Sequence, residues 1–166
     1  MKTAVSQICI SLLFSICSIS LLKAQEYGEN FNSVDVAVLK QIKSQGGTFY
    51  DSWNTKKPYR LTSLGIKNMK GSLDVSKCSA LTDLWCPGNQ LTSLNASGCL
   101  ALSDLDCSDN QLTSLNVSGC TNLINVRCSD NQLASLNISG CPALTDLVCS
   151  NNQLTKLDLS GYLTLI

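Results

Sequence analysis

A unit of 21 residues recurs four times without a gap between residues 81 and 164. The copies read LTDLWCPGNQLTSLNASGCLA, LSDLDCSDNQLTSLNVSGCTN, LINVRCSDNQLASLNISGCPA and LTDLVCSNNQLTKLDLSGYLT. A fixed period of about 20 to 30 residues is typical of a solenoid, in which each coil buries its apolar side only by stacking on its neighbours. A fainter unit over residues 61–80 precedes the four copies, and its Leu61, Leu64 and Ile66 align only if one residue is deleted. We interpret it as a degenerate first repeat.

Alternation within the unit predicts the path of each coil. Leu105, Asp106 and Cys107 alternate between apolar and polar, which predicts a short strand with Leu and Cys facing inward and Asp outward. Like positions of successive coils then stack at about 4.8 Å in a parallel sheet. The second half of the unit also alternates before a Ser-Gly pair, which favours a second short strand or irregular turns over a helix.

These blocks resemble leucine-rich repeats, and specifically a bacterial subclass of 21-residue units with Cys at the sixth position, LxxLxCxxNxLxxLxxSxCxx. The LxxLxCxxNxL core recurs four times, with Val126 in place of the second Leu in one copy. The resemblance extends over roughly residues 61–166. It implies a solenoid with a curved parallel sheet on the concave side, short strands or turns on the convex side, and partner recognition as the usual role.

The segment before the repeats predicts a signal peptide and a cap. Residues 1–24 combine a basic start with an apolar stretch of signal-peptide length, so we expect cleavage after Ala24, with a retained membrane anchor as the alternative. Export predicts a secreted, periplasmic or cell-surface bacterial protein with no membrane span after cleavage. Residues 25–60 predict an N-terminal cap, with a short helix from Ser33 to Gln45 followed by Tyr50, Trp53 and Tyr59.

The sequence stops two residues into another repeat, at residues 165–166, and shows no C-terminal cap. An uncapped solenoid exposes apolar side chains and strand-edge hydrogen-bonding groups. The two expectations are self-association through this end and a fragment of a longer repeat array.

Composition argues against most catalytic and nucleic-acid-binding roles. The chain has no histidine, and its 12 basic residues balance 12 acidic ones, so neither a histidine-based active site nor a strongly basic surface is expected. The cysteine spacings alternate between 8 and 13 residues without a CxxC pair, which does not fit a zinc site. We therefore expect no enzyme, no cofactor and no metal.

Three columns of the repeat are interpreted as structural. An Asn column is expected to satisfy backbone groups at the turn that leaves the strand. The cysteines form two columns, which we interpret as buried thiols, with disulfides between neighbouring coils as the alternative. The columns consist of Asn89, Asn110, Asn131 and Asn152; Cys86, Cys107, Cys128 and Cys149; and Cys78, Cys99, Cys120 and Cys141.

The outward strand positions are the candidate binding site, because packing does not dictate their residues. The third position differs little between coils, whereas the fifth differs in every coil, and Trp and Arg are favoured interface anchors. These positions hold Asp83, Asp104, Asn125 and Asp146, and Trp85, Asp106, Arg127 and Val148.

Charge and pattern together predict a binding module. Residues 81–166 hold seven Asp against Arg127 and Lys156, which favours a protein partner with basic patches and not a nucleic acid. The first hypothesis is a non-catalytic secreted or surface module that binds a protein through the concave face. The second is a structural spacer or a fragment of a larger repeat-containing surface protein.

Overall fold

The computed structural model describes residues 33–53, 60–76, 78–162 and 165 of the 166-residue chain. The predicted signal peptide and Tyr59 lie outside the described residues. No helix in these ranges has the length and apolar character needed to cross a membrane. The elements, in chain order, are α2 (Ser33–Ser44), β1 (Thr48–Trp53), β2 (Leu61–Lys67), β3 (Lys70–Asp74), β4 (Asp83–Trp85), β5 (Gln90–Asn95), β6 (Asp104–Asp106), β7 (Ser114–Asn116), β8 (Asn125–Arg127) and β9 (Asp146–Val148).

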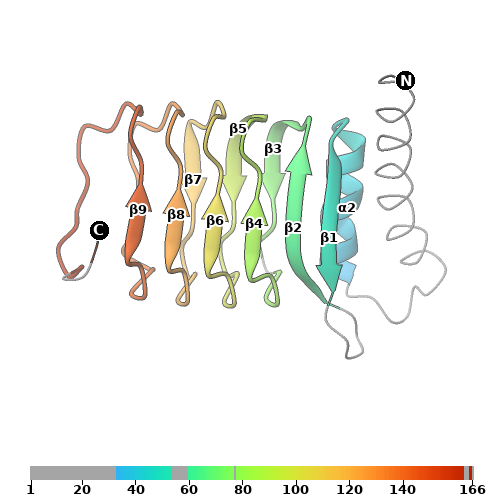
Figure 1. The fold of residues 1–166 in the computed structure, drawn as a ribbon, viewed down its shortest axis with the longest axis horizontal. Helices are drawn as coiled ribbons and strands as arrows, with labels where there is room; N and C mark the ends of the chain where they lie inside the picture. The colour runs from blue at the N-terminus through green and yellow to red at the C-terminus, as the bar shows by residue number, and fades with distance from the viewer. Residues whose placement is uncertain (1–32, 54–59, 77, 163–164, 166) are drawn as a thin grey trace, which may run out of the picture.

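The strands form two sheets that follow the length of the solenoid (Figure 1). The six-stranded sheet has the order β1-β2-β4-β6-β8-β9, and the three-stranded sheet behind it has the order β3-β5-β7. Like positions of successive coils pair in parallel, as Leu84 with Leu105 and Leu94 with Leu115 show. The predicted solenoid with a parallel sheet and a helical cap is confirmed. The second strand forms in the earlier coils only: residues 132–137 and 153–158 are described and contain no strand.

One-sided burial explains the short strands of the six-stranded sheet. Leu84, Leu105 and Val126 lie at the centres of β4, β6 and β8 and are at most 1% exposed, whereas their strand neighbours are half-buried or exposed. The inward side chains of the two sheets meet in one continuous apolar core. Removing this surface from water is the main driving force that holds one coil on the next.

The degenerate first repeat is one residue shorter than the others, and the structure shows where. Leu64 pairs with Leu84, 20 positions later, and Gly71 pairs with Leu91 at the same offset. Ser72 then pairs with Ser93, an offset of 21, across an irregularity between Gly71 and Ser72. Gly71 has a φ of +75°, which glycine adopts without steric cost. The missing residue is therefore absorbed in the three-stranded sheet.

The N-terminal end of the solenoid is covered by α2 and by β1. The apolar face of α2 buries Val38, Leu39 and Ile42, and the helix contacts β1 and β3. Strand β1 pairs antiparallel with β2, so that Phe49 lies opposite Ile66. The sequence analysis predicted the helix but missed this strand, because only a few alternating residues in one short segment signal it.

A buried carboxylate fastens the cap to the first coil. Asp35, in the first turn of α2, is 0% exposed. Its Oδ2 atom accepts a hydrogen bond from the backbone N–H of Leu61 at 2.9 Å and pairs with Nε of Arg60 at 3.1 Å. Leu61 is the first residue of β2, so one side chain joins the helix to the beginning of the six-stranded sheet.

We expect Asp35→Ala to lower the free energy of unfolding by about 3 kcal/mol, because it leaves Arg60 and the N–H of Leu61 without a buried acceptor. Urea unfolding followed by circular dichroism measures the change. Lys40→Ala, at an exposed position of the same helix, is the control and should change stability by less than about 0.5 kcal/mol. Equal effects of the two substitutions would contradict the role assigned to Asp35.

Candidate functional site

The Asn column bonds each coil to its neighbour. The Oδ1 atom of Asn110 accepts from the backbone N–H of Leu91 in the preceding coil at 2.9 Å. Its Nδ2 group donates to the carbonyl of Cys86 in that same coil at 2.8 Å and to the carbonyls of Cys107 and Ser108 in its own coil. The pattern repeats at the other three positions of the column: Asn89, Asn131 and Asn152.

These amides are not a ligand-binding row. Asn89 and Asn110 are 8% exposed, and their polar atoms are directed at backbone groups. One coil earlier, the fully buried Met69 donates its backbone N–H to Asn89, as Leu91 does to Asn110. The Asn column therefore holds the turn after the strand.

The sixth-position cysteines line the core behind the six-stranded sheet. Cys86, Cys107 and Cys128 are 0% exposed, and Cys149 is half-buried. All eight cysteines of the described residues are free thiols. Burial raises the pKa of Cys128 to about 12 and raises that of Cys107 well above its ordinary value, so these thiols stay protonated at neutral pH.

The nineteenth-position cysteines donate hydrogen bonds across the coils. The Sγ atoms of Cys99 and Cys120 each lie 3.1 Å from a backbone carbonyl oxygen 24 residues earlier, in Val75 and Ala96. Cys141 makes the equivalent bond to Val117 at 3.5 Å. Each thiol thus satisfies a carbonyl of the preceding coil with a weak donor of small volume.

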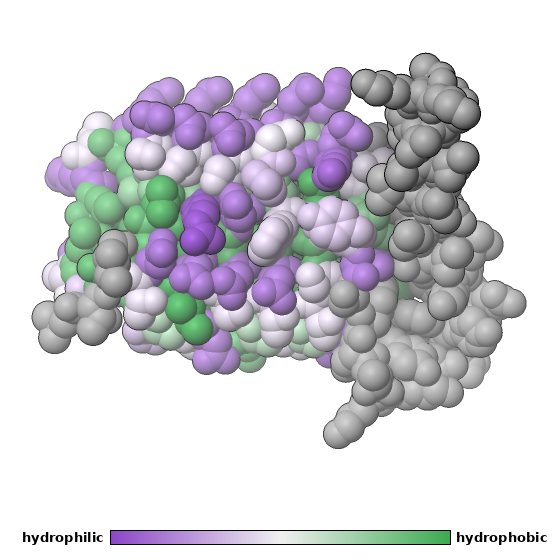
Figure 2. Space-filling model, viewed as in Figure 1, coloured by the Kyte–Doolittle hydropathy of each residue, from purple (hydrophilic) through white to green (hydrophobic). Residues whose placement is uncertain are grey.

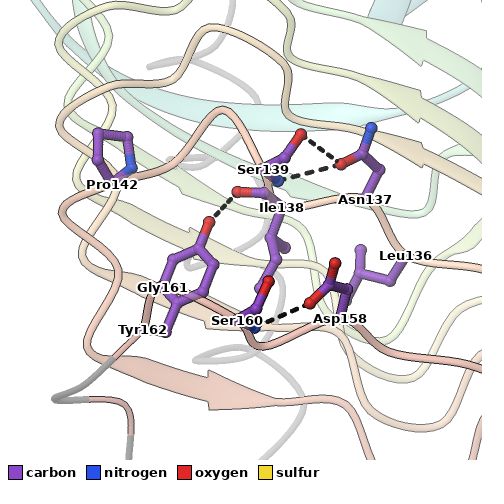
Figure 3. Close-up of a pocket in the computed structure, with 9 residues that line it drawn as sticks. All are labelled: Leu136, Asn137, Ile138, Ser139, Pro142, Asp158, Ser160, Gly161 and Tyr162. Carbon is purple, nitrogen blue, oxygen red and sulfur yellow. Dashed lines mark hydrogen bonds between the residues drawn. The ribbon is translucent and has the colours of Figure 1, made fainter.

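Tyr162 takes the place of cysteine in the last described coil. Its hydroxyl donates to the carbonyl of Ile138, again 24 residues earlier (Figure 3). Its backbone N–H donates to the carbonyl of Leu159, as the cysteines do at their own turns. The sequence analysis assigned no role to this position. The structure shows that the hydrogen bond is kept while the chemical group changes.

A cavity of about 310 Å3 lies beside Tyr162 (Figure 3). It is lined by residues 136–139, Pro142 and residues 158 and 160–162. The polar groups shown around it bond to one another: Ser139 to Asn137 and Ser160 to Asp158. Such internally paired groups offer little to a ligand, and the cavity is not the candidate site.

The third-position residues are half-buried, and those of β4, β6 and β8 are held by local hydrogen bonds. Both oxygens of Asp104 are bonded, Oδ2 to the Ser103 hydroxyl at 2.7 Å and Oδ1 to the Asn125 amide at 2.5 Å. Asp83 bonds to the Thr82 hydroxyl at 2.5 Å in the same way. Asp146, at the same position of β9, is also half-buried. This row contributes negative charge to the face but little freely accessible side chain.

The fifth-position residues are the accessible part of the face. Trp85 is 54% and Val148 is 41% exposed, Arg127 is exposed, and Asp106 is half-buried. They lie side by side in register, because Trp85 pairs with Asp106, Asp106 with Arg127, and Arg127 with Val148. Figure 2 shows this side of the molecule, with hydrophilic side chains across its middle and small hydrophobic patches toward the C-terminal coils.

The structure adds Tyr50 to this row, which the sequence analysis had assigned only to the cap. Tyr50 of β1 pairs with Gly65 of β2, and Gly65 pairs with Trp85 of β4. A Cβ atom on Gly65 would lie 1.9 Å from Cζ of Tyr50, so the phenol ring lies directly over the glycine. Tyr50 remains 46% exposed. The signal for this placement was the glycine at the fifth position of the degenerate repeat.

Two acidic residues at the eighth position belong to the turn. Asp109 and Asp130 have φ values of +53° and +55°, and Gly88 and Asn151 share this left-handed conformation. Asp, Asn and Gly tolerate it better than other residues, which accounts for their alternation in this column. Within the described residues, no group of three or more His, Cys, Asp or Glu side chains is placed to hold a metal ion.

We compared the chain with protein families, curated proteins and solved structures. No protein-family model matches the chain, and no curated protein matches it. The chain is similar to the functional domain of InlJ from Listeria monocytogenes, which includes a cysteine ladder, with 31% sequence identity and a TM-score of 0.47. The likeness covers 63% of this chain and 28% of that one, so this chain matches less than a third of the length of its neighbour.

We expect Asn110→Ala to destabilise the protein by about 1 to 3 kcal/mol, because it leaves the buried N–H of Leu91 without an acceptor and removes one of the two amide donors to each of the carbonyls of Cys86 and Cys107. Thermal and urea unfolding measure the change. The adjacent Gln111 is exposed, and Gln111→Ala serves as the control, with an expected change below about 0.5 kcal/mol. If the melting temperature of Asn110→Ala equals that of the parent, the stabilising role assigned to the Asn column is wrong.

We expect the thiols to be protected in the folded protein. At pH 8, iodoacetamide should modify Cys149 first, because it is half-buried, while the seven buried thiols react only after unfolding. Burial raises the pKa of Cys141 to about 11 and that of Cys99 to about 12, so few thiolates form at that pH. Mass spectrometry of peptides counts the modified sites, and finding disulfides between neighbouring coils would contradict this interpretation.

Proposed function

We propose that this protein is a non-catalytic binding module that recognises a protein partner through the face of the six-stranded sheet. One observation carries the proposal. The fifth-position row presents an aromatic, an acid, a base and an aliphatic residue, Trp85, Asp106, Arg127 and Val148, on strands that are otherwise nearly identical. A surface that varies only where side chains are accessible is typical of recognition.

The scaffold favours binding because little of it has to become ordered. Short strands, a continuous core and an Asn at the turn after each of β4, β6, β8 and β9 fix the positions of the outward side chains before a partner arrives. Preorganisation lowers the entropy cost of association. Exposed Trp and Arg side chains are the residue types that contribute most when they become buried in an interface.

The charge of the face favours a partner with basic patches. At the third and fifth positions of β4, β6, β8 and β9, four residues are Asp and one is Arg. Opposite potentials steer association and suppress partners of like charge. The proposal also places this face outside the cytoplasm, in agreement with the signal peptide predicted over residues 1–24.

We expect Trp85→Ala and Arg127→Ala each to weaken binding of the partner by about 2 kcal/mol or more, with the melting temperature almost unchanged, because both side chains are exposed. The partner is isolated by capture on the parent protein, and its affinity for each variant is measured by surface plasmon resonance. Thr92→Ala, on an exposed position of β5 in the other sheet, is the matched control.

The same measurement separates this proposal from a purely structural role. A spacer has no dedicated face, so a partner captured by all variants with equal affinity would contradict recognition by the six-stranded sheet. A partner lost with Thr92→Ala but kept with Trp85→Ala would move the site to the opposite sheet.

A further inference from the structure

Tyr50, Gly65, Trp85 and Asp106 lie in one row across the six-stranded sheet. We call the surface formed by Tyr50, Trp85 and Asp106 the aromatic corner. Tyr50 lies over Gly65, where no side chain is present to lift it from the sheet. Trp85 projects from the next strand and is 54% exposed. On one side of Trp85 the neighbouring strand carries Gly65, with the Tyr50 ring over it, and on the other side it carries Asp106; neighbouring strands lie about 4.8 Å apart.

Asp106 is held in a defined orientation. Its Oδ1 atom accepts hydrogen bonds from the backbone N–H of Ser108 at 3.0 Å and from the hydroxyl of Ser108 at 2.7 Å. No hydrogen bond within the described part of the chain involves its Oδ2 atom, so that oxygen can accept from a ligand. The orientation of the carboxylate is therefore fixed before a ligand binds, so that binding does not include the entropy cost of ordering this side chain.

Among the described residues, Asp106 forms no ion pair with the neighbouring arginine. Arg127 stands next to Asp106 in register, but the ion pair found among the described residues joins Arg60 to Asp35, at the cap. Asp83 and Asp104 lie at the third positions of β4 and β6 and add to the negative potential around the indole. The corner thus combines aromatic surface with a net negative field.

This combination selects a cation. An aromatic face attracts a positive charge through its quadrupole, and Trp is the strongest of the aromatic side chains in this respect. A carboxylate at the same place supplies the opposite charge and a hydrogen-bond acceptor. An anionic ligand would be repelled by the aspartates, and a purely apolar one would have to desolvate Asp106 without compensation.

We propose that Tyr50, Trp85 and Asp106 form an acceptor site for a lysine or arginine side chain of the partner. The inference rests on the proposed function and specifies the chemistry of its anchor point. The aliphatic part of such a side chain would lie along the ring of Tyr50 and the indole, and its charged end would reach Oδ2 of Asp106.

The test uses the full chain and tripeptides with blocked ends as probes: tri-arginine, tri-lysine, tri-citrulline and tri-glutamate. The indole N–H signal of Trp85 is followed by two-dimensional NMR and assigned with Trp85→Phe. We expect saturable shifts with tri-arginine and tri-lysine and none with the other two. Because exposed cation–π contacts and exposed ion pairs are weak, Asp106→Asn or Tyr50→Leu should each weaken the tri-arginine affinity by about three- to fivefold.

Asp109→Asn is the matched control, because it removes one charge from the same coil at an exposed turn where Asn is equally tolerated. It should change the affinity by less than about twofold, since an exposed charge outside the contact is screened by salt. Tyr50→Phe keeps the ring and should bind as the parent does. A dispersed spectrum establishes that each variant is folded.

Equal losses with Asp109→Asn and Asp106→Asn would overturn the inference, because the effect would then be general electrostatics. Saturable shifts with tri-citrulline would also overturn it and assign the corner to a neutral ligand. A partner that still depends on Trp85 in the capture experiment would leave the proposed function standing in those cases. Independence of Trp85 in both experiments would reject both.

Discussion

Each coil has to leave the sheet directly after a strand of about three residues, and the backbone groups at that turn are shielded from water. The Asn side chain resolves this constraint by accepting from the coil before it and donating to carbonyls of both coils. An unsatisfied buried polar group costs about 1 to 3 kcal/mol. The residues at other positions of the repeat can therefore vary only while the hydrogen bonds between the Asn side chain and the backbone of the two coils are kept. The cysteines beside it provide small volume, and at the nineteenth position they also supply a donor.

Most of the solenoid could be predicted from the sequence because a repeat multiplies weak local signals. One alternation such as that around Leu105 is ambiguous, but four copies in the same register indicate the parallel sheet, the inward Leu and Cys, and the outward fifth position. The cap offered no repetition. Strand β1 depends on a single short segment, and its pairing with β2 is a long-range contact that local alternation does not encode.

The candidate face was predicted in outline and differs in detail. Sequence position alone places the third and fifth residues on the same side, but not that Asp104 is fully hydrogen-bonded while Trp85 stays accessible. Nor could it place Tyr50 in the row, because that requires knowing which strand lies beside Gly65. Both differences depend on contacts with residues of neighbouring strands, which form only after the strands have paired.

The irregularity at Gly71 shows how the two sheets divide their tasks. In the six-stranded sheet the pairing of β2 with β4 stays regular, while the change in chain length is absorbed behind it, in β3 and β5. The three-stranded sheet therefore tolerates a change in chain length, whereas the six-stranded sheet keeps a constant spacing between its strands. Coils of unequal length can be joined in one array, and loops can be grafted at the rear, without altering the spacing at which the front presents its side chains.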